Sequence, residues 1–78
     1  MTVTVLLFAS YAEAYGSSSV SLDLDAGSTV RHLVDRLRSG RSVLPPQPLV
    51  AVNEQYASPD HVINAGDEVA IIPPVAGG

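Results

Sequence analysis

Runs of apolar residues in the first half of the chain predict two strands separated by a short helix. Residues 3–8 are apolar at nearly every position, which is typical of a central strand that is buried on both faces. Residues 9–16 are helix-prone and close at a glycine. Residues 20–25 alternate between apolar and polar, so we expect a half-buried strand at or near a sheet edge there.

A longer helix is predicted by an apolar stripe in the middle of the chain. Apolar residues recur with the spacing i, i+3, i+4 and i+7 at Val30, Leu33, Val34 and Leu37. Either Ser28 or Thr29 can cap the start of this helix by accepting a hydrogen bond from a backbone N–H group. The helix is expected to end near Ser39-Gly40, and its stripe has to pack against another apolar surface.

All the basic residues belong to this helix and its exit: Arg31, Arg36, Arg38 and Arg41. Asp35 follows Arg31 by one helical turn and precedes Arg38 by another, a spacing that permits ion pairs on a helix face. Two interpretations remain open at this point. The arginines form either a solvated helix face or a docking surface for an acidic partner.

The second half of the chain predicts further strands joined by tight turns. Pro45, Pro46 and Pro48 form a stiff connector that cannot join a hydrogen-bond ladder. The elements that follow are a strand at 49–52, a turn at 53–55, a short strand near Tyr56, turns at 58–60 and 65–67, and a last strand at 68–72. This last strand is apolar on both faces and is therefore also expected to be central.

These elements predict an α+β fold with a mixed sheet of four to five strands and one main helix on one face. The first and last strands are the most apolar, so we expect them to lie side by side and parallel in the middle. The helix leaves Leu6, Phe8, Ala70 and Ile72 on the opposite face. A contiguous apolar patch of this kind commonly binds another protein. The alternative is that a loop or residues 10–15 fold over it.

Composition narrows the possible functions further. A chain of 78 residues forms one domain, and without cysteine it has neither disulfides nor thiolate chemistry. A net charge of -4 without any lysine argues against nucleic acid as a partner. No apolar run is long enough to span a membrane, so a cytoplasmic protein is expected. His32 and His61 lack companions at metal-ligand spacing, so no metal site is predicted. The chain also lacks a phosphate-binding glycine loop.

The end of the sequence, Pro73-Pro74-Val75-Ala76-Gly77-Gly78, is its most unusual segment. Two prolines directly after a central strand stop the ladder and direct the chain outward. Two glycines lack side chains, so they can pass through a narrow channel as a thin thread with a carboxylate at its tip. We therefore expect a domain at residues 1–72 and an extended tail at 73–78, the alternative being a frayed terminus.

The closing sequence from Gly66 to Gly78 resembles that of the MoaD-type small subunit of molybdopterin synthase, in the MoaD/ThiS family of ubiquitin-like β-grasp sulfur carriers. Three further segments resemble the family: Leu7-Phe8-Ala9 with Glu13 and Gly16, Thr29-Val30 with Leu33, and Val50-Ala51-Val52-Asn53. The chain departs from the family at Ala12, where an arginine often follows the Phe-Ala pair. A partner contact made through that arginine is in doubt here.

The resemblance implies a chemistry carried by the C-terminus. An ATP-dependent, MoeB-type adenylyltransferase would convert the Gly78 carboxylate to an acyl-adenylate, and sulfur would then replace AMP to give a thiocarboxylate. The large, MoaE-type subunit would take up this sulfur in a heterotetramer and transfer it to cyclic pyranopterin monophosphate, in molybdenum cofactor biosynthesis. ATP would serve the activating enzyme, no cofactor would be stably bound to this chain, and the catalytic side chains would lie on the partner.

The resemblance also assigns roles to residues of this sequence. Gly77 and Gly78 would carry the sulfur, and the partner-binding residues would be Leu6, Phe8, Ile72, Pro73, Pro74, Val75 and Ala76. Three alternatives stay open. They are a sulfur carrier for thiazole, cysteine or tRNA thiolation, a protein modifier that conjugates to lysines, and an interaction module without chemistry of its own.

Overall fold

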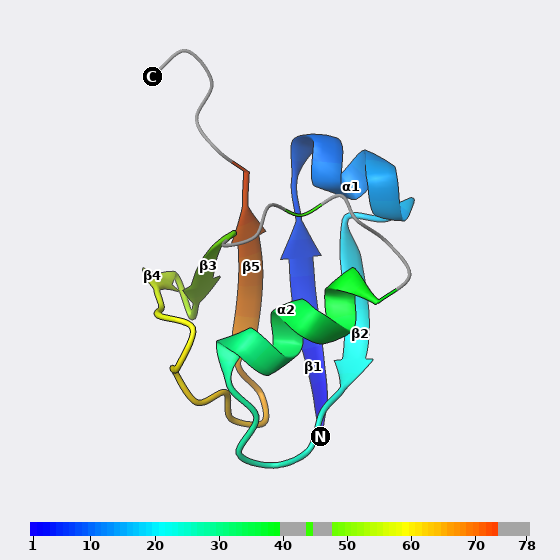
Figure 1. The fold of residues 1–78 in the computed structure, drawn as a ribbon. Coiled ribbons are helices and arrows are strands. Elements are labelled where there is room, and N and C mark those ends of the chain that lie inside the picture. Colours follow the sequence, from blue (N-terminus) through cyan, green and yellow to red (C-terminus); the bar gives the residue numbers. More distant parts are fainter. Residues whose placement is uncertain (40–43, 45–47, 74–78) are drawn as a thin grey trace.

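A computed structural model describes residues 1–39, 44 and 48–73 of the chain (Figure 1). The described elements are β1 (Thr2–Leu7), α1 (Ala9–Tyr15), β2 (Ser19–Asp23), α2 (Val30–Arg38), β3 (Leu49–Val52), β4 (Gln55–Tyr56) and β5 (Glu68–Ile72). Each matches an element that the sequence predicts. Some bounds differ from those expected. The first strand begins one residue earlier and also ends one residue earlier, because Phe8 is the N-cap of α1 instead of a strand residue. β2 begins one residue earlier and ends two residues earlier than expected, and Gln55 belongs to β4 instead of the preceding turn.

The strands form one mixed sheet with the order β2-β1-β5-β3-β4. β1 and β5 lie side by side and parallel, as their apolar sequences predict, while the other neighbouring pairs are antiparallel. β2 lies at one edge, which confirms the interpretation of its alternating pattern. The expected α+β architecture is therefore confirmed, with the predicted central strands in the middle of the sheet.

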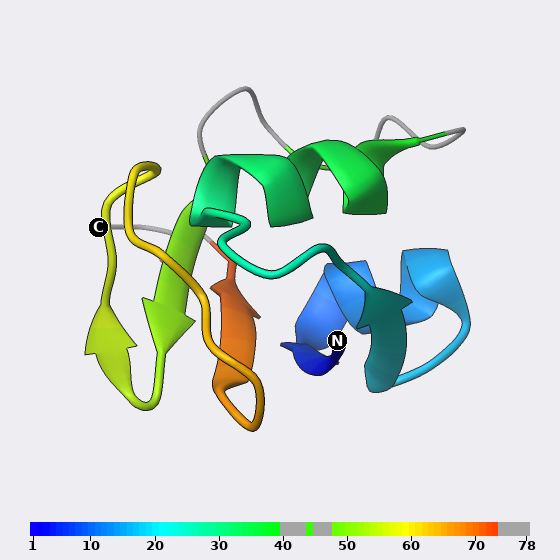
Figure 2. The ribbon, with the colours of Figure 1, turned by 90° about the horizontal axis from the view of Figure 1, so that it is seen from below.

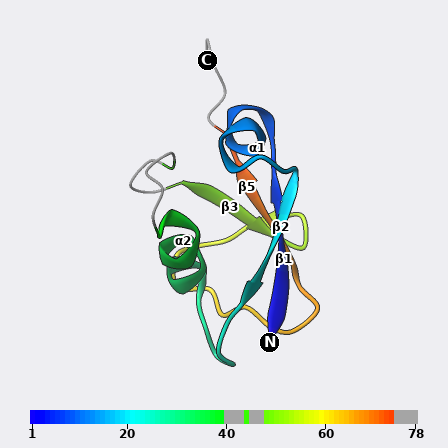
Figure 3. The same cartoon turned by 90° about the vertical axis from the view of Figure 1, so that its right-hand side faces the viewer.

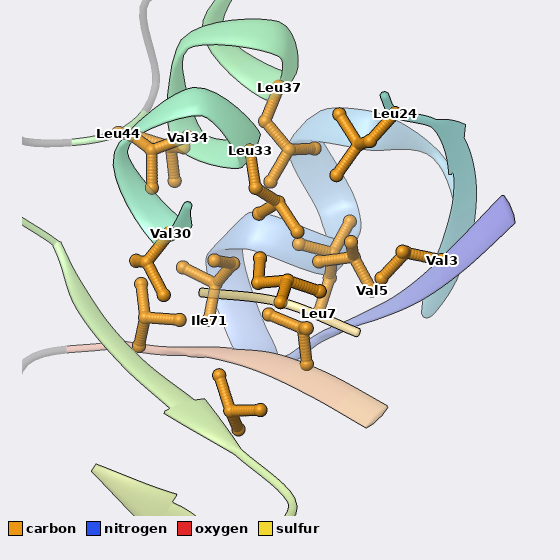
Figure 4. Packing of buried hydrophobic residues seen from close by; sticks show 14 of the residues in the cluster. Val3, Val5, Leu7, Leu24, Val30, Leu33, Val34, Leu37, Leu44 and Ile71 are labelled. Carbon is orange, nitrogen blue, oxygen red and sulfur yellow. The ribbon is translucent and has the colours of Figure 1, made fainter. Parts of the chain in front are cut away.

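Helix α2 lies across one face of this sheet (Figures 1 and 2). Its stripe of Val30, Leu33, Val34 and Leu37 is buried, and Figure 4 shows these side chains pointing toward the strands. The strands contribute alternate residues to the same core: Val3, Val5, Leu7, Val50, Val52, Val69 and Ile71. The hydrophobic effect of burying these side chains on one face accounts for the packing of the helix on the sheet.

The start of α2 has a capping box. Of the two candidate caps, Thr29 is the one used: its hydroxyl accepts a hydrogen bond from the His32 backbone N–H, and His32 Nδ1 accepts one from the Thr29 N–H. An ion pair connects the start of α2 to the loop between β4 and β5. Arg31 of α2 lies 2.7 Å from Asp60 in that loop. That partner is 29 residues away in the sequence and was not predicted from helical spacing.

Helix α1 closes the end of the core and leaves the opposite face of the sheet open. Its Tyr11 belongs to the buried core, and the Tyr15 hydroxyl donates a 2.9 Å hydrogen bond to the Leu37 carbonyl of α2. Gly16 ends the helix in the left-handed conformation, at a φ of 73°. Figure 3 shows α1 at the end of the sheet, and none of residues 10–15 lines the groove on the open face. The alternative in which they cover that face is therefore wrong.

Candidate functional site

The face of the sheet opposite α2 carries a row of residues from four strands. The strand register places Leu6 beside Ala70, Ala70 beside Ala51, and Ala51 beside Tyr56. Two alanines therefore occupy the middle of the row, and larger side chains stand at its ends. In the side view of Figure 3, α2 lies on one side of the sheet and no described helix lies on the other.

This arrangement creates a shallow groove of about 320 Å³ on the open face. Its lining consists of Leu6, Phe8, Ala51, Glu54, Tyr56, Glu68, Ala70 and Ile72. Phe8 is 45% exposed and Tyr56 is 75% exposed. Exposed aromatic side chains beside a concave apolar floor are typical of surfaces that bind another protein.

Unusual backbone conformations occur at both ends of the groove. Ala9, directly after Phe8, has a φ of 50°, and the β3–β4 turn places Asn53 at 52° and Glu54 at 71°. A two-residue hairpin turn with positive φ at both positions favours Asn first and Gly second. Asn53 fits that preference, whereas Ala9 and Glu54 adopt a conformation that residues with a Cβ atom rarely take.

The end of the groove near the β3–β4 turn is acidic. Glu54 and Glu68 both line it, and Asn53 connects the turn to β5 by accepting a 3.0 Å hydrogen bond from the Glu68 N–H. Asp67 supports the same turn with two accepted hydrogen bonds, 2.8 Å from the Asn64 N–H and 3.0 Å from Asn53 Nδ2. These bonds, first the one from Asn64 and then the one from Asn53, lower the pKa of Asp67 below its usual value.

The other end of the groove is apolar and lies where β1 and β5 finish. Because these strands are parallel, their carboxyl ends lie together (Figure 1). The register pairs Leu7 with Ile71, so the next residues in the chain after this pair are Phe8 and Ile72. The structure thus brings together Leu6, Phe8 and Ile72, three of the predicted partner-binding residues, and Pro73 follows directly. The remaining predicted residues, Pro74, Val75, Ala76, Gly77 and Gly78, lie outside the described part of the chain.

Sequence reasoning missed half of this groove. Ala51, Glu54, Tyr56 and Glu68 line it but were not predicted site residues. Finding Ala51 and Tyr56 requires the position of β3 beside β5, because only that neighbour places them on the same face as Ala70. The positions of the acidic residues depend on the turn conformation as well.

Metal-binding groups and membrane-spanning helices are absent from the described part of the chain. Among residues 1–39, 44 and 48–73, no group of three or more His, Asp or Glu side chains could hold a metal ion. Neither α1 nor α2 is long and apolar enough to cross a bilayer. A second hollow of about 300 Å³ lies between α2 and the segment around Pro48, Ala57 and Pro59, but it is next to residues that the structure does not describe.

The overall arrangement defines the class of protein as a ubiquitin-like β-grasp fold. The structure of small archaeal modifier protein 1 from Haloferax volcanii superimposes on it with a TM-score of 0.84, at 31% identity and covering 100% of both chains. The complex of subunits 1 and 2 of the molybdopterin-converting factor from Helicobacter pylori contains a similar chain, with a TM-score of 0.71 at 20% identity and 100% of both chains covered. This second similarity concerns the fold alone.

Sequence comparisons narrow the class to one family. The family model described as the ThiS family matches residues 5–78. The molybdopterin synthase sulfur carrier subunit of Dictyostelium discoideum is 37% identical over 84 residues, covering 95% of this chain and 93% of the relative. Small archaeal modifier protein 1 of Haloferax volcanii is 34% identical over 83 residues, covering 92% and 95%. The chain belongs to the MoaD/ThiS family of sulfur carriers.

Proposed function

We propose that this chain is the sulfur-carrying small subunit of a molybdopterin synthase. The observation that carries the proposal is the 37% identity to a molybdopterin synthase sulfur carrier subunit across 95% of the chain. The sequence Pro73-Pro74-Val75-Ala76-Gly77-Gly78 supports it, because a carrier of this kind needs a narrow segment ending in a carboxylate.

The chemistry takes place at the Gly78 carboxylate. This group is a poor electrophile, because its charge is delocalised and it has no good leaving group. The activating enzyme uses ATP to form an acyl-adenylate and releases pyrophosphate. A nucleophile at the oxidation level of sulfide then displaces AMP and leaves a thiocarboxylate. No side chain of this protein takes part, which is consistent with a chain that has no cysteine.

The open face provides the contact with the large subunit. Leu6, Phe8 and Ile72 lie at the apolar end of the groove, next to the residue from which the tail continues. A partner bound there is within reach of Pro73 to Gly78, so docking brings the sulfur to the partner's active site. The large subunit supplies the catalytic side chains, and cyclic pyranopterin monophosphate receives the sulfur.

Reconstitution tests this proposal directly. The purified thiocarboxylate form is mixed with the large subunit from the same genome and the pyranopterin precursor, and molybdopterin is measured. Formation of molybdopterin is expected, together with recovery of the Gly78 carboxylate. Absence of product, with sulfur passing instead to a thiazole, a cysteine precursor or tRNA, would assign the chain to another sulfur-transfer pathway.

A second candidate function is protein modification. It is favoured by the similarity to small archaeal modifier protein 1, at 34% identity over most of both chains. The chain contains no lysine, so it could modify other proteins but could not build side-chain-linked polymers of itself. Isolating the tagged chain from cells distinguishes the two: a modifier is recovered as many covalent adducts through Gly78, whereas a carrier is recovered free.

A further inference from the structure

We propose that the groove recognises a partner segment with an apolar side chain at one end and a lysine or arginine at the other. The inference rests on the proposed function, because it assigns this segment to the large subunit. The apolar side chain would lie at the apolar end of the groove, over Ala70 and against Phe8 and Ile72. The basic group would lie at the acidic end, against Glu54 and Glu68.

Charge complementarity carries the proposal. Both charged residues that line the described groove are acidic. The described basic side chains are Arg31, Arg36 and Arg38 of α2, which packs on the opposite face. A partner segment with a carboxylate near Glu54 and Glu68 would be repelled, and one with a cation would be attracted. Charges at the rim of an interface act chiefly on partner choice and association rate.

The two ends of the groove differ in chemistry, so the groove has a direction. Glu68 is the first residue of β5 and Ile72 is the last, so their Cα atoms are separated by about 13 Å at the usual rise of a strand. The apolar end is the one from which the tail continues. A basic contact at the far end therefore fixes the direction in which the partner binds, and orients its active site toward the tail.

The conformation of Glu54 is consistent with this role. Its φ of 71° is one that glycine adopts without strain. A glutamate at this position stores strain in the turn, and strain of this kind tends to persist at functional positions. The carboxylate of Glu54 gives the groove a charge that glycine would not supply.

The test compares the affinities of variants for the large subunit from the same genome, by titration at low and high salt. Glu54→Gln and Glu68→Gln each remove one charge without a large change in shape. Together they are expected to weaken binding about tenfold at low salt, and less at high salt, because exposed charges are screened. Asp35→Asn is the matched control: it removes one charge from α2 on the opposite face, and its affinity is expected to equal that of the wild type.

The variant Glu54→Gly distinguishes a loss of binding from a loss of folded structure. It relieves the strained turn, so we expect a higher Tm together with weaker binding, which a general loss of structure cannot produce. If the wild type binds the large subunit and the double glutamine variant binds equally well at low salt, the inference is overturned while the proposed function stands. If the wild type itself does not bind, the proposed function fails.

Discussion

The two faces of the sheet use alternate residues of the same strands and differ in what covers them. On the side of α2, Val5, Val69 and Ile71 are fully buried. On the open side their neighbours Leu6, Ala70 and Ile72 remain partly exposed, and they line a groove. Because side chains alternate along a strand, one short sequence supplies both surfaces.

The difference assigns separate tasks to the two faces. Burial on the covered face stabilises the fold, whereas the exposed apolar groups on the open face contribute little to it and are available to a partner. Truncations on the covered face should therefore lower stability first, and truncations on the open face should lower binding first. The following variants test that separation.

The largest effect is expected for Ile71→Ala. Ile71 is fully buried between the central strands and α2, so removing its side chain leaves a cavity and should lower the free energy of unfolding by about 2–5 kcal/mol. Urea denaturation measures this value. Ile72→Ala is the matched control from the other face, and an equal loss in both variants would contradict the division between the faces.

Phe8→Ala should weaken binding to the large subunit and leave stability nearly unchanged. Phe8 is 45% exposed, so we expect its removal to change the free energy of unfolding by less than about 1 kcal/mol. Binding to the large subunit should weaken by about 2 kcal/mol, as for other aromatic anchors, which calorimetric titration can measure. Val62→Ala, at a similarly exposed residue outside the groove (48%), should bind normally. Unchanged binding by Phe8→Ala would remove the groove from the interface.

Glu54→Gly should have a smaller effect on the free energy of unfolding, and should raise it instead of lowering it. Glycine adopts the φ of 71° at this position without the Cβ clash, and we expect the free energy of unfolding to rise by about 1 kcal/mol. Thermal unfolding followed by circular dichroism is a suitable measurement. Glu54→Ala keeps the Cβ atom and serves as the control. A stabilisation of the same size in both variants would show that the turn is not strained.

The smallest effect is the pH dependence contributed by Asp67. Hydrogen bonds from Asn64 and Asn53 lower its pKa in the folded state, so the ionised form stabilises the fold. This contribution is fully present above the unfolded-state pKa and is lost as the pH falls through the lower folded-state pKa. In acid titrations from about pH 5 downward, Asp67→Asn should show a shallower loss of stability than the wild type. Identical profiles would contradict the assignment.

Much of the fold could be predicted because it depends on local patterns. The apolar sequences of β1 and β5 predict their central, parallel pairing, and the stripe of α2 predicts its buried face. The same alternation predicts that Leu6, Phe8 and Ile72 lie on the open side. Contacts between distant segments could not be predicted in this way. The ion pair of Arg31 with Asp60 depends on how the chain returns after β4.

The acidic end of the groove illustrates the same limit. Glu54 and Glu68 are separated in the sequence by β4 and by the whole loop between β4 and β5. They come together because β3 pairs with β5 and a turn with two positive φ values follows β3. Hydrophobic periodicity does not predict the register of that strand pair. It also does not predict that a glutamate occupies a turn position that favours glycine.

Sulfur carriage by the C-terminus can be measured by intact mass spectrometry. The chain is incubated with the activating enzyme from the same genome, ATP and a sulfide source, alongside a variant that lacks Gly78. We expect the wild-type mass to rise by the difference between one sulfur and one oxygen atom, at the C-terminal residue, and the mass of the shortened variant to stay unchanged. An unmodified wild-type chain, under conditions in which the same enzyme adenylates another carrier, would contradict sulfur carriage by this chain.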